Sequence, residues 1–179
     1  MKIFWLVAAA MVITPTIRAQ GKIDDLGGCG ADATKFKVQG AEVNSATYKP
    51  DPPPGEKEAR VFLVQDSGGQ VNCFHLGCIT SRAGLDGVWI GANQGDSYFS
   101  FVVTPGEHHL CVNWQSKFGN ESSHHALANF QADAGKNYYF RVRVWGKAGQ
   151  AYMDLDAVNN DEGRYLVSRA TQAISQPEK

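Results

Sequence analysis

The chain has 179 residues, of which 43% are apolar and 11% are aromatic. This content is sufficient for a single domain with a packed core of ordinary size, so the fold need not depend on covalent cross-links. The formal net charge is −1 and the sequence contains no run of Lys and Arg. That argues against nucleic-acid binding, because phosphate recognition needs clustered cations.

Residues 1–19 have the pattern of a cleavable signal peptide. Lys2 precedes an unbroken apolar run at residues 3–13, and a short segment containing Pro15 then leads to Ala19. The run is too short to cross a membrane as a helix, which needs about 20 apolar residues. We therefore expect export to the periplasm or the medium, cleavage after Ala19, and no transmembrane anchor in the mature chain.

The four cysteines, Cys29, Cys73, Cys78 and Cys111, all follow this segment. In the oxidising compartment that an exported protein reaches, an even number of cysteines favours disulfides. Three pairings are possible. We favour Cys73 with Cys78, which flank a short Gly-containing loop, and Cys29 with Cys111. Two alternatives are zinc, for which CxxC doublets are absent, and lipidation of Cys29, since residues 26–29 resemble a lipobox.

Residues 20–55 form a Gly- and Pro-rich N-terminal arm with a short strand expected at residues 35–38. The proline-rich stretch at residues 50–56 fits a turn or a polyproline element and cannot lie in the centre of a sheet. It separates the arm from the domain body, which we place at residues 56–170.

From residue 60 onward, apolar and β-branched runs are separated by turn residues at intervals of about 8 to 15 residues, which indicates consecutive strands. Residues 104–107 are expected to form a hairpin turn, because Pro presets φ and the following Gly accepts positive φ. Residues 134–137 are a second turn. The expected strands are residues 60–65, 87–90, 97–103, 108–114, 126–131, 137–145 and 152–155.

The C-terminal part is expected to contain one short helix. Asn159 and Glu162 resemble a capping box, which would start a helix that ends near Arg169. Residues 171–179 are expected to be a loose tail. Consecutive hairpins with one apolar face and a single helix predict a mainly β fold, a small antiparallel β-sandwich of immunoglobulin-like or prealbumin-like type.

Strand alternation assigns the faces of two strands. In residues 108–114, Cys111 lies opposite the apolar set, where a covering arm could reach it. In residues 137–145 the expected core side chains are Tyr138, Phe140, Val142 and Val144, and the opposite row contains Tyr139, Arg141, Arg143 and Trp145.

Four motifs occur in a fixed order at residues 85–91, 97–99, 105–108 and 134–141. Together they resemble the exported bacterial family called domain of unknown function 2846, over roughly residues 60–169, and also PEGA-type surface domains. The resemblance implies a small β-sandwich in an exported protein or lipoprotein with a non-enzymatic role at the cell envelope. The motifs belong to turns and core, so they transfer no catalytic residue.

The sequence also contains residues that suit other chemistries. Histidines can hold a transition metal, but adjacent histidines on a strand point to opposite faces. A thiol nucleophile at Cys73 lacks an orienting third group, and no serine lies in a GxSxG elbow, so a secreted hydrolase is an alternative without a motif. The acidic stretch at residues 154–162 fails the spacing of a calcium loop. The five histidines are His75, His108, His109, His124 and His125.

The row of Tyr139, Arg141, Arg143 and Trp145 is the candidate binding surface. Aromatic rings beside guanidinium groups can stack on sugars or hold acidic partners. A covering sheet or arm would instead make the row part of the core. We expect an exported, non-enzymatic envelope module with a structural or binding role and no cofactor, and this face as the place where an envelope protein or a glycan would bind.

Overall fold

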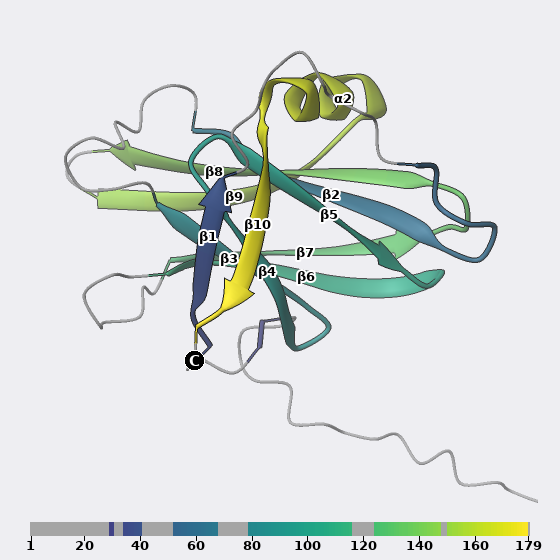
Figure 1. Cartoon of the computed structure of the whole chain (residues 1–179), viewed down its shortest axis with the longest axis horizontal. Helices are drawn as coiled ribbons and strands as arrows, with labels where there is room; N and C mark the ends of the chain where they lie inside the picture. Colours follow the sequence, from purple (N-terminus) through teal and green to yellow (C-terminus); the bar gives the residue numbers. More distant parts are fainter. Residues whose placement is uncertain are drawn as a thin grey trace, which may run out of the picture.

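The computed structural model describes residues 29–30, 34–40, 52–67, 79–115, 124–147 and 150–178. Within these ranges ten strands and one helix form two sheets that pack face to face (Figure 1). The predicted β-sandwich with a short helix near the C-terminus is confirmed.

The larger sheet has six strands in the order β1-β10-β5-β2-β8-β9. This sheet is mixed and not purely antiparallel as predicted, because β2 runs parallel to β8 and β10 runs parallel to β5, whereas the other neighbours are antiparallel. Its strands are β1 (Phe36–Gly40), β2 (Ala59–Gln65), β5 (Ser97–Val103), β8 (Asn137–Lys147), β9 (Gln150–Val158) and β10 (Thr171–Pro177).

The smaller sheet has four antiparallel strands in the order β4-β3-β6-β7. They are β3 (Thr80–Leu85), β4 (Val88–Gln94), β6 (Gly106–Gln115) and β7 (His125–Ala132). Apolar side chains from the two facing layers form the main core, among them Leu63, Leu110, Val112, Phe140 and Val142.

Strand β2 is buried on both faces. Val61 and Leu63 point into the core between the sheets, while Phe62 and Val64 belong to a second cluster on the outer side. A continuous apolar run rather than an alternating one is what a strand covered on both sides requires.

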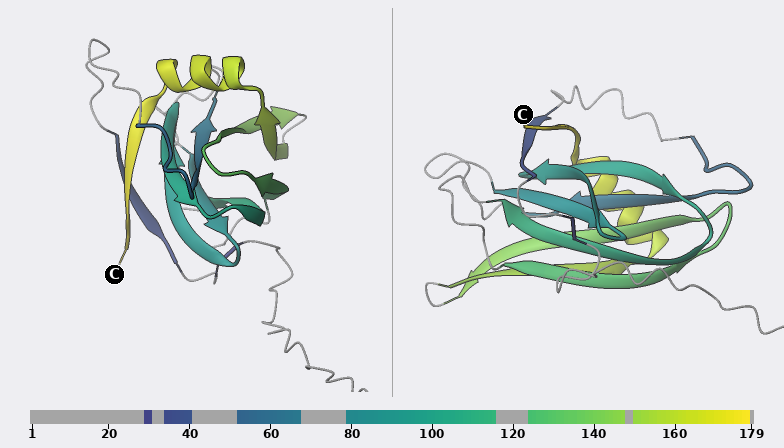
Figure 2. Two further views of the ribbon diagram at one scale, coloured as in Figure 1. Left: turned by 90° about the vertical axis from the view of Figure 1, so that its right-hand side faces the viewer. Right: turned by 90° about the horizontal axis from the view of Figure 1, so that it is seen from below.

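Helix α2 (Asn160–Arg169) covers that outer side (Figure 2). It begins as predicted, because the Asn159 side chain accepts hydrogen bonds from the backbone N–H groups of Asp161 and Glu162, both at 3.0 Å. Val167 is 1% exposed and packs in the cluster that contains Phe62.

The chain reverses at both predicted turns, but the first of them does not join two strands of one sheet as a hairpin turn would. Thr104 and Pro105 connect β5 in the larger sheet to β6 in the smaller one, which begins at Gly106, so the chain crosses from one layer to the other instead of forming a hairpin. Residues 134–137 cross back in the same way, with Gly135 at a φ of +73°. Turn residues specify a reversal of the chain, and they do not specify the sheet that the next strand joins.

The tail predicted to be loose is a strand. Residues Thr171–Pro177 form β10, which pairs with β1 along five residues and with β5 at two. Its apolar alternation is weak, with Ala173 buried and Ile174 exposed. Residues 171–177 form a strand because they pair with β1 and β5, which are distant in sequence, and their own composition does not indicate a strand. Strand β3 was missed as well, because its buried residues include Ser81 and Arg82.

The contact between α2 and the sheet makes a first testable prediction. A Cβ placed on Gly163 would collide with the ring of Tyr139. Overpacking costs about 1 to 3 kcal/mol and a helical Gly→Ala change gains about 1, so Gly163→Ala should lower the free energy of unfolding by about 1 kcal/mol. Arg164→Ala, at an exposed position on the same helix, is the control and should change it little. Urea denaturation measures both, and a stabilised Gly163→Ala variant would contradict this packing.

Candidate functional site

The outer face of β8 and β9 carries a two-column ladder of side chains. Antiparallel pairing places alternate residues of the two strands directly opposite one another on the same face. From the helix end to the open end, the pairs are Tyr139 with Val158, Arg141 with Asp156, Arg143 with Asp154, and Trp145 with Tyr152.

Tyr139 lies at the covered end of the ladder and is not a surface residue. It is 6% exposed and stacks on Phe62, with ring centroids 4.8 Å apart and an interplanar angle of 12°. Its proposed role as a binding contact is therefore wrong, because the helix that follows β9 folds back over this part of the face. Alternation separates the two faces of a strand, but it does not identify what packs on each one.

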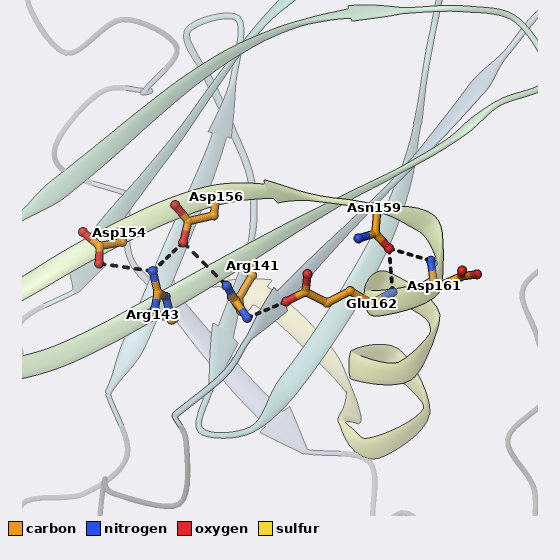
Figure 3. Close-up of polar contacts among 7 residues, drawn as sticks. All are labelled: Arg141, Arg143, Asp154, Asp156, Asn159, Asp161 and Glu162. Carbon is orange, nitrogen blue, oxygen red and sulfur yellow. Dashed lines mark hydrogen bonds and ion pairs between the residues drawn. The ribbon is translucent and has the colours of Figure 1, made fainter.

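Arg141 connects the helix to the strands (Figure 3). Its Nη1 donates to Oε1 of Glu162 at 2.7 Å, and its Nη2 lies 4.0 Å from Oδ2 of Asp156. The side chain is 23% exposed. The contact joins the first turn of α2 to the sheet, so Arg141 is mainly an anchor for the helix.

Arg143 lies further out and is more open to solvent, with a side-chain exposure of 44%. Its Nη2 donates to Oδ2 of Asp156 at 2.7 Å and lies 3.7 Å from Oδ2 of Asp154 (Figure 3). This guanidinium is held between two carboxylates that are two residues apart on β9.

Trp145 and Tyr152 form the exposed end of the ladder. The two rings stack with centroids 4.5 Å apart and an interplanar angle of 19°, and the residues are 41% and 37% exposed. The indole Nε1 of Trp145 donates to Oδ2 of Asp154 at 2.7 Å. The stacking and this hydrogen bond together fix the orientation of the indole.

The sequence identified Trp145 and both arginines but missed Tyr152 and Asp154 as members of the surface. Tyr152 was placed in a strand, and its neighbour on β8 depends on the pairing register, which the sequence of one strand does not determine. The acidic residues of this region, which fail the spacing of a calcium loop, are engaged by cations of the chain: Asp154 and Asp156 pair with Arg143, and Asp161 pairs with Arg164.

The histidines that the structure describes lie apart from this face, on strands of the smaller sheet or beside them. His108 is buried at 8% exposure, and both of its ring nitrogens face acceptors: Nδ1 lies 2.7 Å from Oδ2 of Asp86, and Nε2 lies 2.8 Å from the carbonyl oxygen of Thr104. Burial works against its charge, but the hydrogen bond to Asp86, the bond to Thr104 and the charge of Asp86 outweigh it and raise its pKa above the usual 6.5.

The structure gives no support to the alternative of a histidine metal site in the part of the chain that it describes. There, no group of three or more His, Cys, Asp or Glu side chains is placed to hold a metal ion. His109 lies on an exposed part of β6. The ring of His124 packs beside that of Trp114, with ring centroids 5.6 Å apart. His75 lies outside the described residues.

One predicted disulfide is confirmed. Cys29 and Cys111 are bonded, and both are buried, at 3% and 0% exposure. As expected from alternation, Cys111 lies on the outer face of β6, where the N-terminal arm reaches it. Cys73 and Cys78 lie outside the described residues, so their pairing stays a prediction.

A cavity of about 270 Å³ lies beside β1, lined by Lys35, Phe36, Lys37, Val38, Thr80, Gln94, Gln115 and Glu178. Several of its polar groups bond to one another. The Gln115 amide accepts from the backbone N–H of Phe36 at 2.7 Å and donates to its carbonyl at 2.9 Å, and Gln94 donates to the hydroxyl of Thr80 at 3.1 Å. The side chain of Gln115 thus attaches β1 to the smaller sheet.

Comparison with known proteins leaves the family open. No protein-family model and no solved structure matches the chain. It is similar to an uncharacterised protein of Haemophilus influenzae, with 26% identity over 91 residues, which are 51% of this chain and 50% of that protein. The chain thus spans about half the length of this relative. Within the described residues, no helix is long and apolar enough to cross a membrane.

Proposed function

We propose that this protein is an exported, non-enzymatic binding module of the cell envelope, and that it engages its partner through the open end of the β8–β9 face. The signal-like sequence at residues 1–19 supports export. The buried disulfide between Cys29 and Cys111 is compatible with an oxidising compartment outside the cytoplasm.

The observation that carries the proposal is the exposed Trp145–Tyr152 stack. Two large rings stacked on one another at the surface offer apolar area that water solvates poorly, and aromatic residues dominate the energetics of binding surfaces. Both rings are held before any partner arrives, by each other and by the bond from Trp145 to Asp154. A preorganised surface avoids the entropic cost of ordering side chains on binding.

The test replaces one ring and compares binding with stability. Trp145→Ala should weaken binding to purified envelope material from the native host by about tenfold or more, which is the usual effect of truncating a central aromatic contact. Its melting temperature should stay within a few degrees of the parent, because the ring lies on the surface. Arg143→Ala should weaken binding less and also leave stability nearly unchanged, since exposed ion pairs contribute about 0 to 1 kcal/mol.

Tyr165→Ala is the matched control, because Tyr165 is 59% exposed but lies on α2, away from the Trp145–Tyr152 stack. This variant should bind like the parent protein. If Trp145→Ala unfolds the domain, or if it binds envelope material as well as the parent does, the surface proposed here is not the binding surface.

A further inference from the structure

We infer that the ligand of this face is an electrically neutral, hydroxyl-rich glycan, which stacks on the Trp145–Tyr152 pair and bonds along the row of Arg143, Asp154 and Asp156. The inference rests on the proposed function and specifies the chemistry of its partner.

The charge of the ladder disfavours an acidic ligand. Its two guanidinium groups, on Arg141 and Arg143, face three carboxylates, on Asp154, Asp156 and Glu162, so the local formal charge is −1. Each guanidinium already contacts two carboxylates. An acidic protein or an anionic polysaccharide would have to displace these pairs and approach a net negative surface.

The ladder also keeps hydrogen-bonding groups available at its open end. Asp154 and Asp156 use only their Oδ2 atoms in the contacts found among the described residues, so both Oδ1 atoms can accept a further bond. In the same contacts Arg143 uses only Nη2, although a guanidinium has five N–H donors. The row therefore offers acceptors and donors next to one another.

A hydroxyl group can use such a mixed row, because it both donates and accepts. An ammonium group only donates and would leave the N–H donors of Arg143 unused, while a carboxylate only accepts and would be repelled by Asp154 and Asp156. Asp154 and Asp156 are two residues apart on one strand, with Cα atoms about 7 Å apart, and both carboxylates turn toward the same Nη2 of Arg143, so neighbouring hydroxyls of a sugar chain can reach both.

The aromatic pair supplies the apolar part of the site. A sugar ring has a face of C–H groups that packs against an aromatic ring, which gives contact area without requiring charge. The same rings could accept a cation, so a basic peptide is the competing ligand. Arg143, which lies next to Trp145 on the same face of β8 and is 44% exposed, disfavours it.

The experiment measures binding of the purified protein to an array of neutral and anionic oligosaccharides and to octalysine, followed by titration calorimetry of the strongest binder. A neutral oligosaccharide is expected to bind best. Trp145→Ala and Asp154→Ala should each weaken it by about tenfold or more, Trp145→Phe should retain most of the affinity because it keeps a ring, and Tyr165→Ala should have no effect.

Two results would overturn the inference: preference for octalysine or an anionic oligosaccharide, or no binding to any member of the array. The proposed function would survive either result if Trp145→Ala still abolished binding to envelope material. It would fail with the inference if that substitution left binding to envelope material intact. Thermal melting of each variant confirms that every comparison is made on folded protein.

Discussion

Replacing Cys29 and Cys111 together by Ala should lower the free energy of unfolding by roughly 4 to 5 kcal/mol. The two cysteines are 82 residues apart in sequence, and a cross-link that closes so long a loop removes many conformations from the unfolded chain. Since a domain of this size is stabilised by only about 5 to 15 kcal/mol, the variant should lose a large part of its stability. Urea denaturation of the parent and the double variant measures the difference.

Both proteins in the presence of reductant are the internal control, because neither then has a disulfide, whether or not Cys73 is paired with Cys78. They should unfold at nearly the same urea concentration. A loss below about 1 kcal/mol in the variant would show that the disulfide does not constrain the unfolded chain as the loop-entropy model requires.

The disulfide is one of several contacts that hold the arm on the smaller sheet. A Cβ on Gly30 would lie within 3 Å of the Trp89 indole, so this position allows only glycine at such a close approach. Arg82 donates to the carbonyl of Thr34 at 2.6 Å, and its guanidinium lies 4.4 Å from the centroid of the Trp89 ring. The arm predicted as a separate segment is thus packed on the domain where the structure describes it.

The strands that the sequence predicted are those whose own residues encode burial. Strand β8 alternates strictly, and β2 is continuously apolar, so both were placed within two residues of their bounds. Strand β3 buries Ser81, Arg82 and Ala83, a set that gives no strand signal until the arm covers it. Its polar groups find partners from other segments, such as Asn113, which accepts from Arg82 at 2.6 Å.

The face on which the candidate site lies could be predicted from the sequence, but the contacts of its residues could not. Alternation in β8 placed Arg141, Arg143 and Trp145 on one face, and the structure keeps them there. The role of each depends on β9 and α2, which cover Tyr139, neutralise the arginines and add Tyr152 beside Trp145. The partners of the β8 side chains depend on the register between β8 and β9 and on where the chain goes after β9. The sequence of β8 alone contains no information on either.

The pair of buried His108 and exposed Asp86 should make stability depend on pH. His108 joins the crossing from β5 to β6, through Thr104, to the turn between β3 and β4, through Asp86. Both partners are hydrogen-bond acceptors, so only the imidazolium form, with an N–H on each ring nitrogen, can donate to both at once. Neutral His108 must leave one ring nitrogen facing an acceptor without a proton between them.

The direction in which stability changes with pH follows from the raised pKa of His108. The unfolded chain has the ordinary histidine pKa of about 6.5, so the folded protein binds a proton more tightly. The stabilisation by His108 is therefore complete below about pH 6.5 and is lost as the pH rises through the higher pKa of the folded state. The unfolding free energy of the parent, minus that of His108→Gln, should fall over this interval.

At low pH we expect His108→Gln to cost about 2 kcal/mol, the contribution of hydrogen bonds to a charged group that is largely shielded from water. His109→Gln is the matched control, because His109 is the adjacent residue but its side chain is exposed. That substitution should leave both the stability and its pH dependence close to those of the parent. Urea denaturation at several pH values between 5.5 and 8.5, about one unit below and two above the ordinary histidine pKa, provides the measurement. A difference between parent and His108→Gln that stays constant or grows with pH would show that His108 is not held as the imidazolium ion.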